Sequence, residues 1–295
     1  MFLSIFDIFK IGVGPSSSHT MGPMAAAARF RDLLAATALP QRRLRIACQL
    51  FGSLAYTGEG HGTFRAVLSG LLGMTPQTYD REAADSALEE LAVSKAVRLA
   101  NGTLVSIDPA TAIIAERGKR LPAHPNGMTF VLEDEVGRPF ASETYYSIGG
   151  GFVLTEAEMA RGGDGLPEID VPYPFGTASE MLEMGNASGL SIAVMKRANE
   201  EARQPGDLDA RIMAVWDVMD RCIDRGLTGE GILPGGLNVK RRAHGLSEKL
   251  AARAGANDAP LHSAVDWLQA YAMAVNEENA AGGQVVTAPT NGAAG

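Results

Sequence analysis

One change in the hydrophobic pattern divides the chain, at the glycine-, proline- and acid-rich residues 162–175. Ahead of that segment, apolar side chains recur at every second position in several short runs, the period of a half-buried strand. These runs are 43–51, 103–107, 128–134 and 140–148. Beyond the segment, the apolar positions between Ile212 and Ile223 follow helical spacing and predict a buried stripe. The pattern predicts an α+β N-terminal domain at 1–161, a linker at 162–175 and the beginning of an all-α domain at 176–295.

Charge and length narrow the classes of protein that fit this sequence. A chain of 295 residues with 46% hydrophobic residues has the material for two cores. Its net charge of −8 argues against binding to nucleic acid, which calls for basic patches. No apolar run approaches the roughly 20 residues of a membrane span, and the first ten residues lack the features of a signal peptide. We expect a cytoplasmic protein that binds neither nucleic acid nor membranes.

The stretch 12–23 combines three serines and a histidine between glycines and prolines, directly before an alanine-rich run that predicts a helix over 24–38. Backbone N–H groups at the start of a helix, with the positive end of the helix dipole, suit a carboxylate or phosphate. Ser16, Ser17 and Ser18 are therefore candidate anion-binding residues, and His19 is a candidate catalytic group. The alternative is a polar helix cap with a spare histidine.

Three further stretches have a similar composition. Residues 52–63 form a predicted loop in which glycines flank His61, and residues 121–128 combine His124 with Asn126. The stretch 145–152 follows a predicted strand with Ser147 and three glycines. Glycines at such positions cost conformational entropy without filling a core, so they indicate that something approaches the backbone closely.

Taken together, these stretches resemble the iron–sulfur-dependent L-serine dehydratases (L-serine ammonia-lyases), in their single-chain bacterial form. The resemblance is collinear over the whole chain. It is carried by GPSSSHTMGP at 14–23, FGSLAYTGEGHGT at 51–63, HPNGM at 124–128, YYSIGGGF at 145–152, VPYPF at 171–175, EGILPGGL at 230–237, and NEENAAGG with VVTAPTNGAAG at 276–295.

The resemblance implies an N-terminal α+β domain, similar to an effector-binding domain of some phosphoglycerate dehydrogenases, and an all-α catalytic domain. It implies conversion of L-serine to pyruvate and ammonia, with a [4Fe–4S] cluster on three cysteines acting as a Lewis acid. We expect L-serine as the small-molecule partner and a homodimer as the assembly.

Roles for individual residues follow from the motifs. We expect His61 to remove the α-proton of the substrate, since its glycine neighbours permit close approach, with His19 and His124 as alternatives. Ser16, Ser17 and Ser18 suit the substrate carboxylate. The candidates for binding the amino or hydroxyl group of the substrate are Asn126, Ser147, Thr290 and Asn291.

Cysteine usage sets this sequence apart from the family pattern. Cys48 and Cys222 are its only cysteines, both at apolar positions of separate elements, so we predict no cluster and no metal ion on this chain alone. The family's cluster cysteines follow its PTNGA segment, within which this sequence stops, and that predicts a fragment without activity of its own. The alternative hypothesis is a non-catalytic regulatory module that binds an amino acid.

Overall fold

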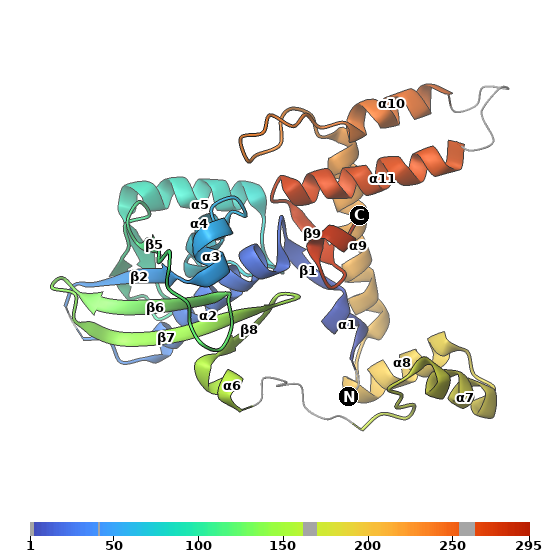
Figure 1. Ribbon diagram of the computed structural model, residues 1–295, viewed down its shortest axis with the longest axis horizontal. Helices are drawn as coiled ribbons and strands as arrows, with labels where there is room; N and C mark the ends of the chain where they lie inside the picture. Colours follow the sequence, from blue (N-terminus) through green and yellow to red (C-terminus); the bar gives the residue numbers. More distant parts are fainter. Residues whose placement is uncertain (1–2, 41, 162–169, 254–262) are drawn as a thin grey trace.

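The computed structural model describes residues 3–40, 42–161, 170–253 and 263–295. A part that mixes strands and helices comes first, and a helical part follows it, which confirms the predicted fold class (Figure 1). Residues 162–169 of the predicted linker lie outside the described residues. The domain boundaries at 161 and 176 stay a prediction.

A mixed sheet forms the centre of the N-terminal part. Its order is β3 (Ala96–Arg98), β4 (Leu104–Ser106), β2 (Leu44–Leu50), β6 (Gly127–Asp134), β7 (Pro139–Gly149) and β8 (Phe152–Thr155), with β5 (Ile113–Ala115) also paired to β2. Strand β2 runs parallel to β4 and β5 and antiparallel to β6, while β6, β7 and β8 form an antiparallel meander. The predicted strands at 43–51, 103–107, 128–134 and 140–148 are confirmed as β2, β4, β6 and β7.

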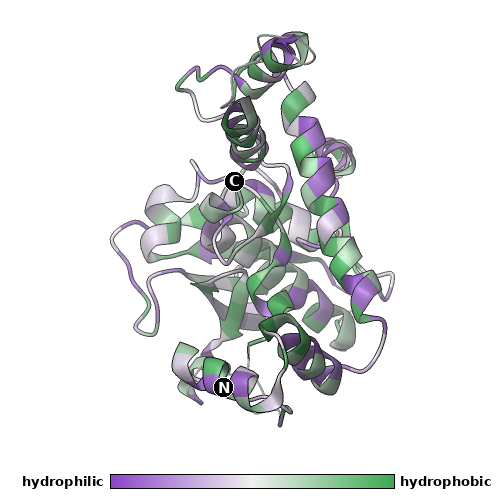
Figure 2. Ribbon diagram, turned by 90° about the vertical axis from the view of Figure 1, so that its right-hand side faces the viewer, coloured by the Kyte–Doolittle hydropathy of each residue, from purple (hydrophilic) through white to green (hydrophobic). Residues whose placement is uncertain are grey.

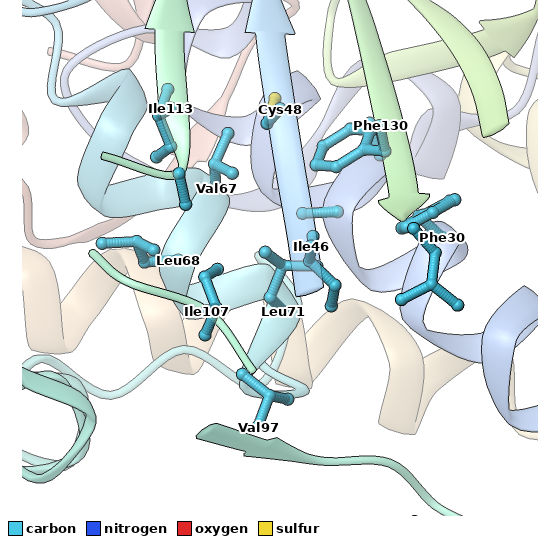
Figure 3. Packing of buried hydrophobic residues seen from close by; sticks show 14 of the residues in the cluster. Phe30, Ile46, Cys48, Val67, Leu68, Leu71, Val97, Ile107, Ile113 and Phe130 are labelled. Carbon is cyan, nitrogen blue, oxygen red and sulfur yellow. The ribbon is translucent and has the colours of Figure 1, made fainter. Parts of the chain in front are cut away.

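Two helices cover one face of this sheet. Helices α2 (Gly22–Ala36) and α4 (Thr63–Leu71) pack against each other, and α2 also contacts β6, β7 and β8. Strand β2 turns Leu44, Ile46, Cys48 and Leu50 to that side and leaves its alternate residues partly exposed, as a period of two requires. These side chains join Phe30, Val67 and Phe130 in the main core (Figure 3).

The stretch 52–63, predicted as a loop, begins instead with a short helix, α3 (Gly52–Thr57). Leu54 and Ala55 are buried, and Leu54 belongs to the main core, so burial of these two side chains outweighs the glycine-rich composition. Gly52 opens the helix with a φ of +52°, and a Cβ there would meet the Pro125 carbonyl oxygen at 2.2 Å. Only glycine fits both requirements. Helices α5 (Arg81–Ser94) and α6 (Glu156–Ala160) complete this part.

The C-terminal part consists of α7 (Ala178–Ser188), α8 (Ile192–Arg203), α9 (Leu208–Thr228), α10 (Ala243–Arg253) and α11 (Ser263–Ala280), then strand β9 (Gln284–Thr287) and a 3₁₀ turn at Asn291–Ala293. Helix α9 packs against α10 and α11. None of the described helices is both long and apolar enough to cross a membrane.

The predicted buried stripe on α9 is only partly correct. Of the predicted positions, Cys222 is buried, but Ile212 and Trp216 remain 37% and 52% exposed. Helix geometry places the predicted positions along one side of α9. Near its C-terminal end, Cys222 and Ile223 pack against Val275 of α11 and Val285 of β9. Figure 2 shows hydrophobic and hydrophilic residues alternating along the helices of this part.

The first residues of the chain contact the C-terminal part. Helix α1 (Ile5–Ile8) begins at Ser4, whose hydroxyl donates to the buried Glu200 carboxylate at 2.6 Å, and Asp7 forms an ion pair with Arg203. Strand β1 (Lys10–Val13) then pairs with β9 antiparallel, so the segment that leads into the serine-rich stretch lies beside the end of the sequence (Figure 1).

Gly70 fixes how closely α4 approaches α2. A Cβ at Gly70 would lie 2.3 Å from the Met24 carbonyl oxygen and 2.7 Å from the Ala27 Cβ, so Gly70→Ala has to push the two helices apart. We expect it to lower the free energy of unfolding by about 1–3 kcal/mol, the usual cost of overpacking. Gly245, inside α10, is the matched control because a Cβ there meets nothing within 4 Å. Gly245→Ala should raise stability by about 0.5–1 kcal/mol. Urea unfolding of both variants measures the difference, and equal effects would contradict the packing argument.

Candidate functional site

The serine-rich stretch forms a tight turn that runs directly into α2. Residues Ser17–Met21 make one π-helical turn, and the Ser16 hydroxyl caps it by accepting from the His19 N–H at 3.2 Å. Within the described residues, no hydrogen bond uses the backbone N–H groups of Ser17 and Ser18. Free N–H groups at the start of a helix suit a negatively charged group. These N–H groups suit the carboxylate that the sequence predicts there, and its binding stays a prediction.

His19 and His61 lie together although 42 positions separate them in the sequence. Their ring centroids are 4.9 Å apart, with an angle of 40° between the ring planes. Both ring nitrogens of His19 have hydroxyl partners, Ser18 at Nδ1 and Ser53 at Nε2, each at 2.9 Å. Burial lowers the pKa of His19, and the neighbouring His61 lowers it further, which favours a neutral His19 ring at pH 7.

The two ring nitrogens of His61 differ: one has a hydrogen-bond partner, and the other has none in the part of the chain that the structure describes. Its Nδ1 lies 2.8 Å from the Thr57 carbonyl oxygen, which can only accept, so Nδ1 carries the proton and donates it. In the neutral ring, Nε2 then holds a lone pair, and no hydrogen bond within the described residues uses it. The ring is half-buried at the edge of the site. This arrangement suits a general base.

His124 has the opposite tautomer. Its Nδ1 lies 3.2 Å from the backbone N–H of Asn126 and accepts from it, which places the proton of the neutral ring on Nε2. Burial lowers the pKa of His124. The neighbouring Pro125 carbonyl accepts from the Ser53 N–H at 2.9 Å, so the His124 loop contacts the helix that binds His19.

Asn126 and Ser147 support the serine-rich turn from the sheet. The Ser147 hydroxyl donates to the Ser18 carbonyl at 2.8 Å, and the Asn126 side-chain amide donates to the Ser147 carbonyl at 3.1 Å. Both residues are buried: Ser147 is 0% exposed and Asn126 is 9% exposed. The four motif stretches of the N-terminal part thus form one hydrogen-bonded cluster.

The two predicted site residues near the end of the sequence differ in their surroundings. Asn291 is buried, and its amide donates to the Val13 carbonyl at 2.9 Å and to Asn279 at 3.1 Å. Asn279 in turn donates to the Pro15 carbonyl, and Gly14 packs so closely on Asn279 that a Cβ there would lie 2.0 Å from its carbonyl oxygen. Thr290 is exposed. Asn291 therefore anchors the strand that leads into the serine-rich turn.

A cavity of about 340 Å³ adjoins the turn at Thr20. Thr20, Gly60 and Gly62 line it from the histidine segments, Arg65 lines it from α4, and Pro234 lines it from the C-terminal part. Its volume is within the range of small-molecule sites. The histidine segments thus face a space to which both parts of the chain contribute.

The cysteines lie apart from this site and from each other. Cys48 packs in the main core, where burial raises its pKa, and Cys222 packs against Val275 and Val285, where burial raises its pKa to about 11. In the described part of the chain, no three His, Cys, Asp or Glu side chains are grouped as metal ligands. These residues do not fit an iron–sulfur cluster, whose ligands are thiolates.

Sequence reasoning missed four residues that hold the histidines: Thr20, Ser53, Thr57 and Thr63. The Thr20 hydroxyl donates to the His61 carbonyl at 2.7 Å, and the Thr63 hydroxyl donates to the His19 carbonyl. All four lie inside the motif stretches, so their position was a signal, but a sequence does not show which ring nitrogen or carbonyl group each of them contacts.

Comparison with known proteins matches both parts of the chain. The family model described as serine dehydratase beta chain matches residues 4–158, and the model described as serine dehydratase alpha chain matches residues 187–295. Named relatives include the L-serine dehydratase of Streptomyces coelicolor, 45% identical over 100% of this chain, and that of Mycobacterium tuberculosis, 43% identical over 100% of it. L-serine dehydratase 1 of Escherichia coli is 42% identical over 99% of this chain. The chain spans 63–64% of the length of these relatives. It belongs to the serine dehydratase family.

Proposed function

We propose that the protein containing this chain is an L-serine dehydratase that converts L-serine to pyruvate and ammonia. The observation that supports this most directly is the His61 ring, whose Nδ1 is fixed by the Thr57 carbonyl while Nε2 keeps a lone pair. That lone pair lies in the same cluster as an anion-binding turn. A base and a carboxylate site side by side are what removal of an α-proton from an amino acid requires.

The described residues divide the work as follows. The free N–H groups of Ser17 and Ser18, with the Ser16 and Ser18 hydroxyls, bind the carboxylate of L-serine. His61 Nε2 accepts the proton from Cα, and the Cα–H electron pair forms the Cα=Cβ bond as the Cβ–O bond breaks. The departing hydroxide takes up that proton, so that L-serine gives aminoacrylate and one molecule of water. Tautomerisation and addition of water then release ammonia and pyruvate. His19, neutral and held by two hydroxyls, keeps the wall of the site in place.

Membership of the family implies a [4Fe–4S] cluster, but Cys48 and Cys222 do not fit as its ligands. We therefore assign no step of the reaction to a cluster held by Cys48 or Cys222. Ser147 donates to the Ser18 carbonyl of the turn that carries the serines, and Asn126 donates to the Ser147 carbonyl, so both act on the substrate through that turn. The roles of Thr290 and Asn291 toward the amino or hydroxyl group stay predictions, as do the homodimer and the cytoplasmic location.

An anaerobic assay of the protein at its natural length, loaded with iron and sulfide, tests the proposal. We expect pyruvate and ammonia in equal amounts from L-serine, and none from D-serine, because the base lies on one side of the carboxylate site only. L-Threonine, which would give 2-oxobutyrate, measures the preference between the two amino acids.

The second hypothesis, a regulatory module that only binds an amino acid, predicts a different result in the same experiment. Iron-loaded protein would then bind L-serine in a calorimeter and release no pyruvate. The comparisons do not favour that hypothesis, because the family models and the named relatives are all serine dehydratases.

A further inference from the structure

Two buried threonines exchange hydrogen bonds between the segments that carry His19 and His61. Thr20, next to His19, donates its hydroxyl to the His61 carbonyl oxygen at 2.7 Å. Thr63, two residues after His61, donates its hydroxyl to the His19 carbonyl oxygen. Their exposed fractions are 4% and 0%. We call this reciprocal pair, with the two carbonyl groups it binds, the threonine clasp.

The His61 segment has few other attachments. It is a turn in which the N–H groups of His61 and Thr63 both bond to the Gly58 carbonyl, and Gly62 has a φ of +65°. Glu59 and Gly60 at its tip are exposed. Within the described residues, the hydrogen bonds that join His61 itself to groups outside this turn are those of its ring to Thr57 and of its carbonyl to Thr20. A glycine-rich turn with so few attachments can shift unless the clasp holds it.

The clasp hydroxyls have little capacity left for a ligand. The Thr20 hydroxyl gives its hydrogen to His61 and accepts from the Ser16 N–H at 3.3 Å, and Thr63 is closed off from solvent. Both threonines act on the chemistry through the histidine backbones, which makes them positioning residues.

We propose that the threonine clasp sets the distance between the His19 and His61 rings and the direction of the His61 Nε2 lone pair. This inference rests on the proposed function for its catalytic consequence, but its structural content stands on the two hydrogen bonds. A general base has to lie within hydrogen-bonding distance of the proton it removes. A displacement of about 1 Å costs about 10²-fold in rate, so two hydrogen bonds that fix the base affect turnover without touching the substrate.

Valine and serine substitutions at both positions test the clasp in the protein at its natural length. Thr20→Val and Thr63→Val keep the shape of the side chain and remove the hydroxyl, and Thr20→Ser and Thr63→Ser keep the hydroxyl. Thr37→Val is the matched control, because the Thr37 hydroxyl also donates to a carbonyl, that of Leu33 at 2.7 Å, but at the end of α2. We expect the first two to lower kcat by about 10–10²-fold with little change in KM, the serine variants to recover most of it, and the control to match wild type.

Nitrogen-15 NMR of the histidine rings supplies a measurement that needs no turnover. Wild-type protein and Thr37→Val should show His61 as the Nδ1–H tautomer with one set of ring signals. Each valine variant of the clasp should shift or broaden the ring signals of both His19 and His61. The loss of kcat in the double valine variant should be smaller than the two single losses combined, because breaking either hydrogen bond releases the same turn.

Three outcomes would refute the proposal or separate it from the proposed function. Unchanged ring signals in both valine variants refute the clasp whatever the activity. Shifted signals in a protein that makes no pyruvate support the clasp and refute the proposed function. If Thr63→Val unfolds, as circular dichroism would show, Thr20→Val and Thr63→Ser still decide the question, since loss of turnover in the serine variant as well would refute a role for the hydroxyl.

Discussion

His61→Ala in the natural-length protein is expected to lower kcat for L-serine by about 10²–10⁴-fold, the usual contribution of a general base. The expectation follows from the ring geometry, in which Nδ1–H donates to the Thr57 carbonyl and leaves Nε2 as the proton acceptor. KM should change little, because the serine-rich turn binds the carboxylate without His61. Deuterium at Cα of L-serine should slow the residual reaction, since proton removal becomes the slow step.

Imidazole in the buffer gives a sharper version of this experiment. Gly60 and Gly62 flank the position, and the ring is half-exposed, so removal of the side chain leaves room for a small base. We expect imidazole to restore part of the activity of His61→Ala and none of any activity lost in Thr63→Val. A histidine with a purely structural role would show no such rescue.

Two other histidines serve as comparisons. His124→Ala should cost about tenfold or less, because its Nδ1 accepts from the Asn126 N–H and its Nε2 carries the proton. His244→Ala should leave kcat unchanged, since its ring contacts the Leu227 carbonyl and Glu230 in the C-terminal part. A larger loss in His124→Ala than in His61→Ala would move the base to His124.

The sequence predicted those parts of the fold in which the local hydrophobic pattern matches the side that is buried. The alternation in β2 and β6 is visible in the sequence because one face of the sheet packs on α2 and α4. The helix at 52–57 differs from the predicted loop because the four glycines of 52–63 mask Leu54 and Ala55, both of which are buried. On α9, helical spacing correctly indicated an apolar side, but spacing carries no information on what covers it.

The candidate site could likewise be predicted only in part from the sequence. Histidines and serines within glycine-rich stretches marked the segments, and His19 and His61 do lie together. The tautomers that separate His61 from His124 depend on which backbone group faces each Nδ1, and that is a property of the folded chain. Asn291 shows a further limit, because the sequence could not show that its amide donates to the Val13 carbonyl. Its role toward the substrate stays a prediction.

The chain of 295 residues, treated anaerobically with iron and sulfide, is expected to form no [4Fe–4S] cluster and to make no pyruvate. Thiolates are the cluster ligands, and burial raises the pKa of both Cys48 and Cys222, so neither thiol ionises readily. Cys48 lies within the sheet core and Cys222 within a separate apolar cluster, and ligands of one cluster have to converge on one small site.

Bound iron, acid-labile sulfide and the visible charge-transfer absorption of the product measure this directly. The control is the double variant Cys48→Ser with Cys222→Ser, which should retain as little iron as the wild-type chain, since neither thiol is used. Stoichiometric iron and sulfide in the wild-type chain but not in the control would show that the two cysteines are ligands after all.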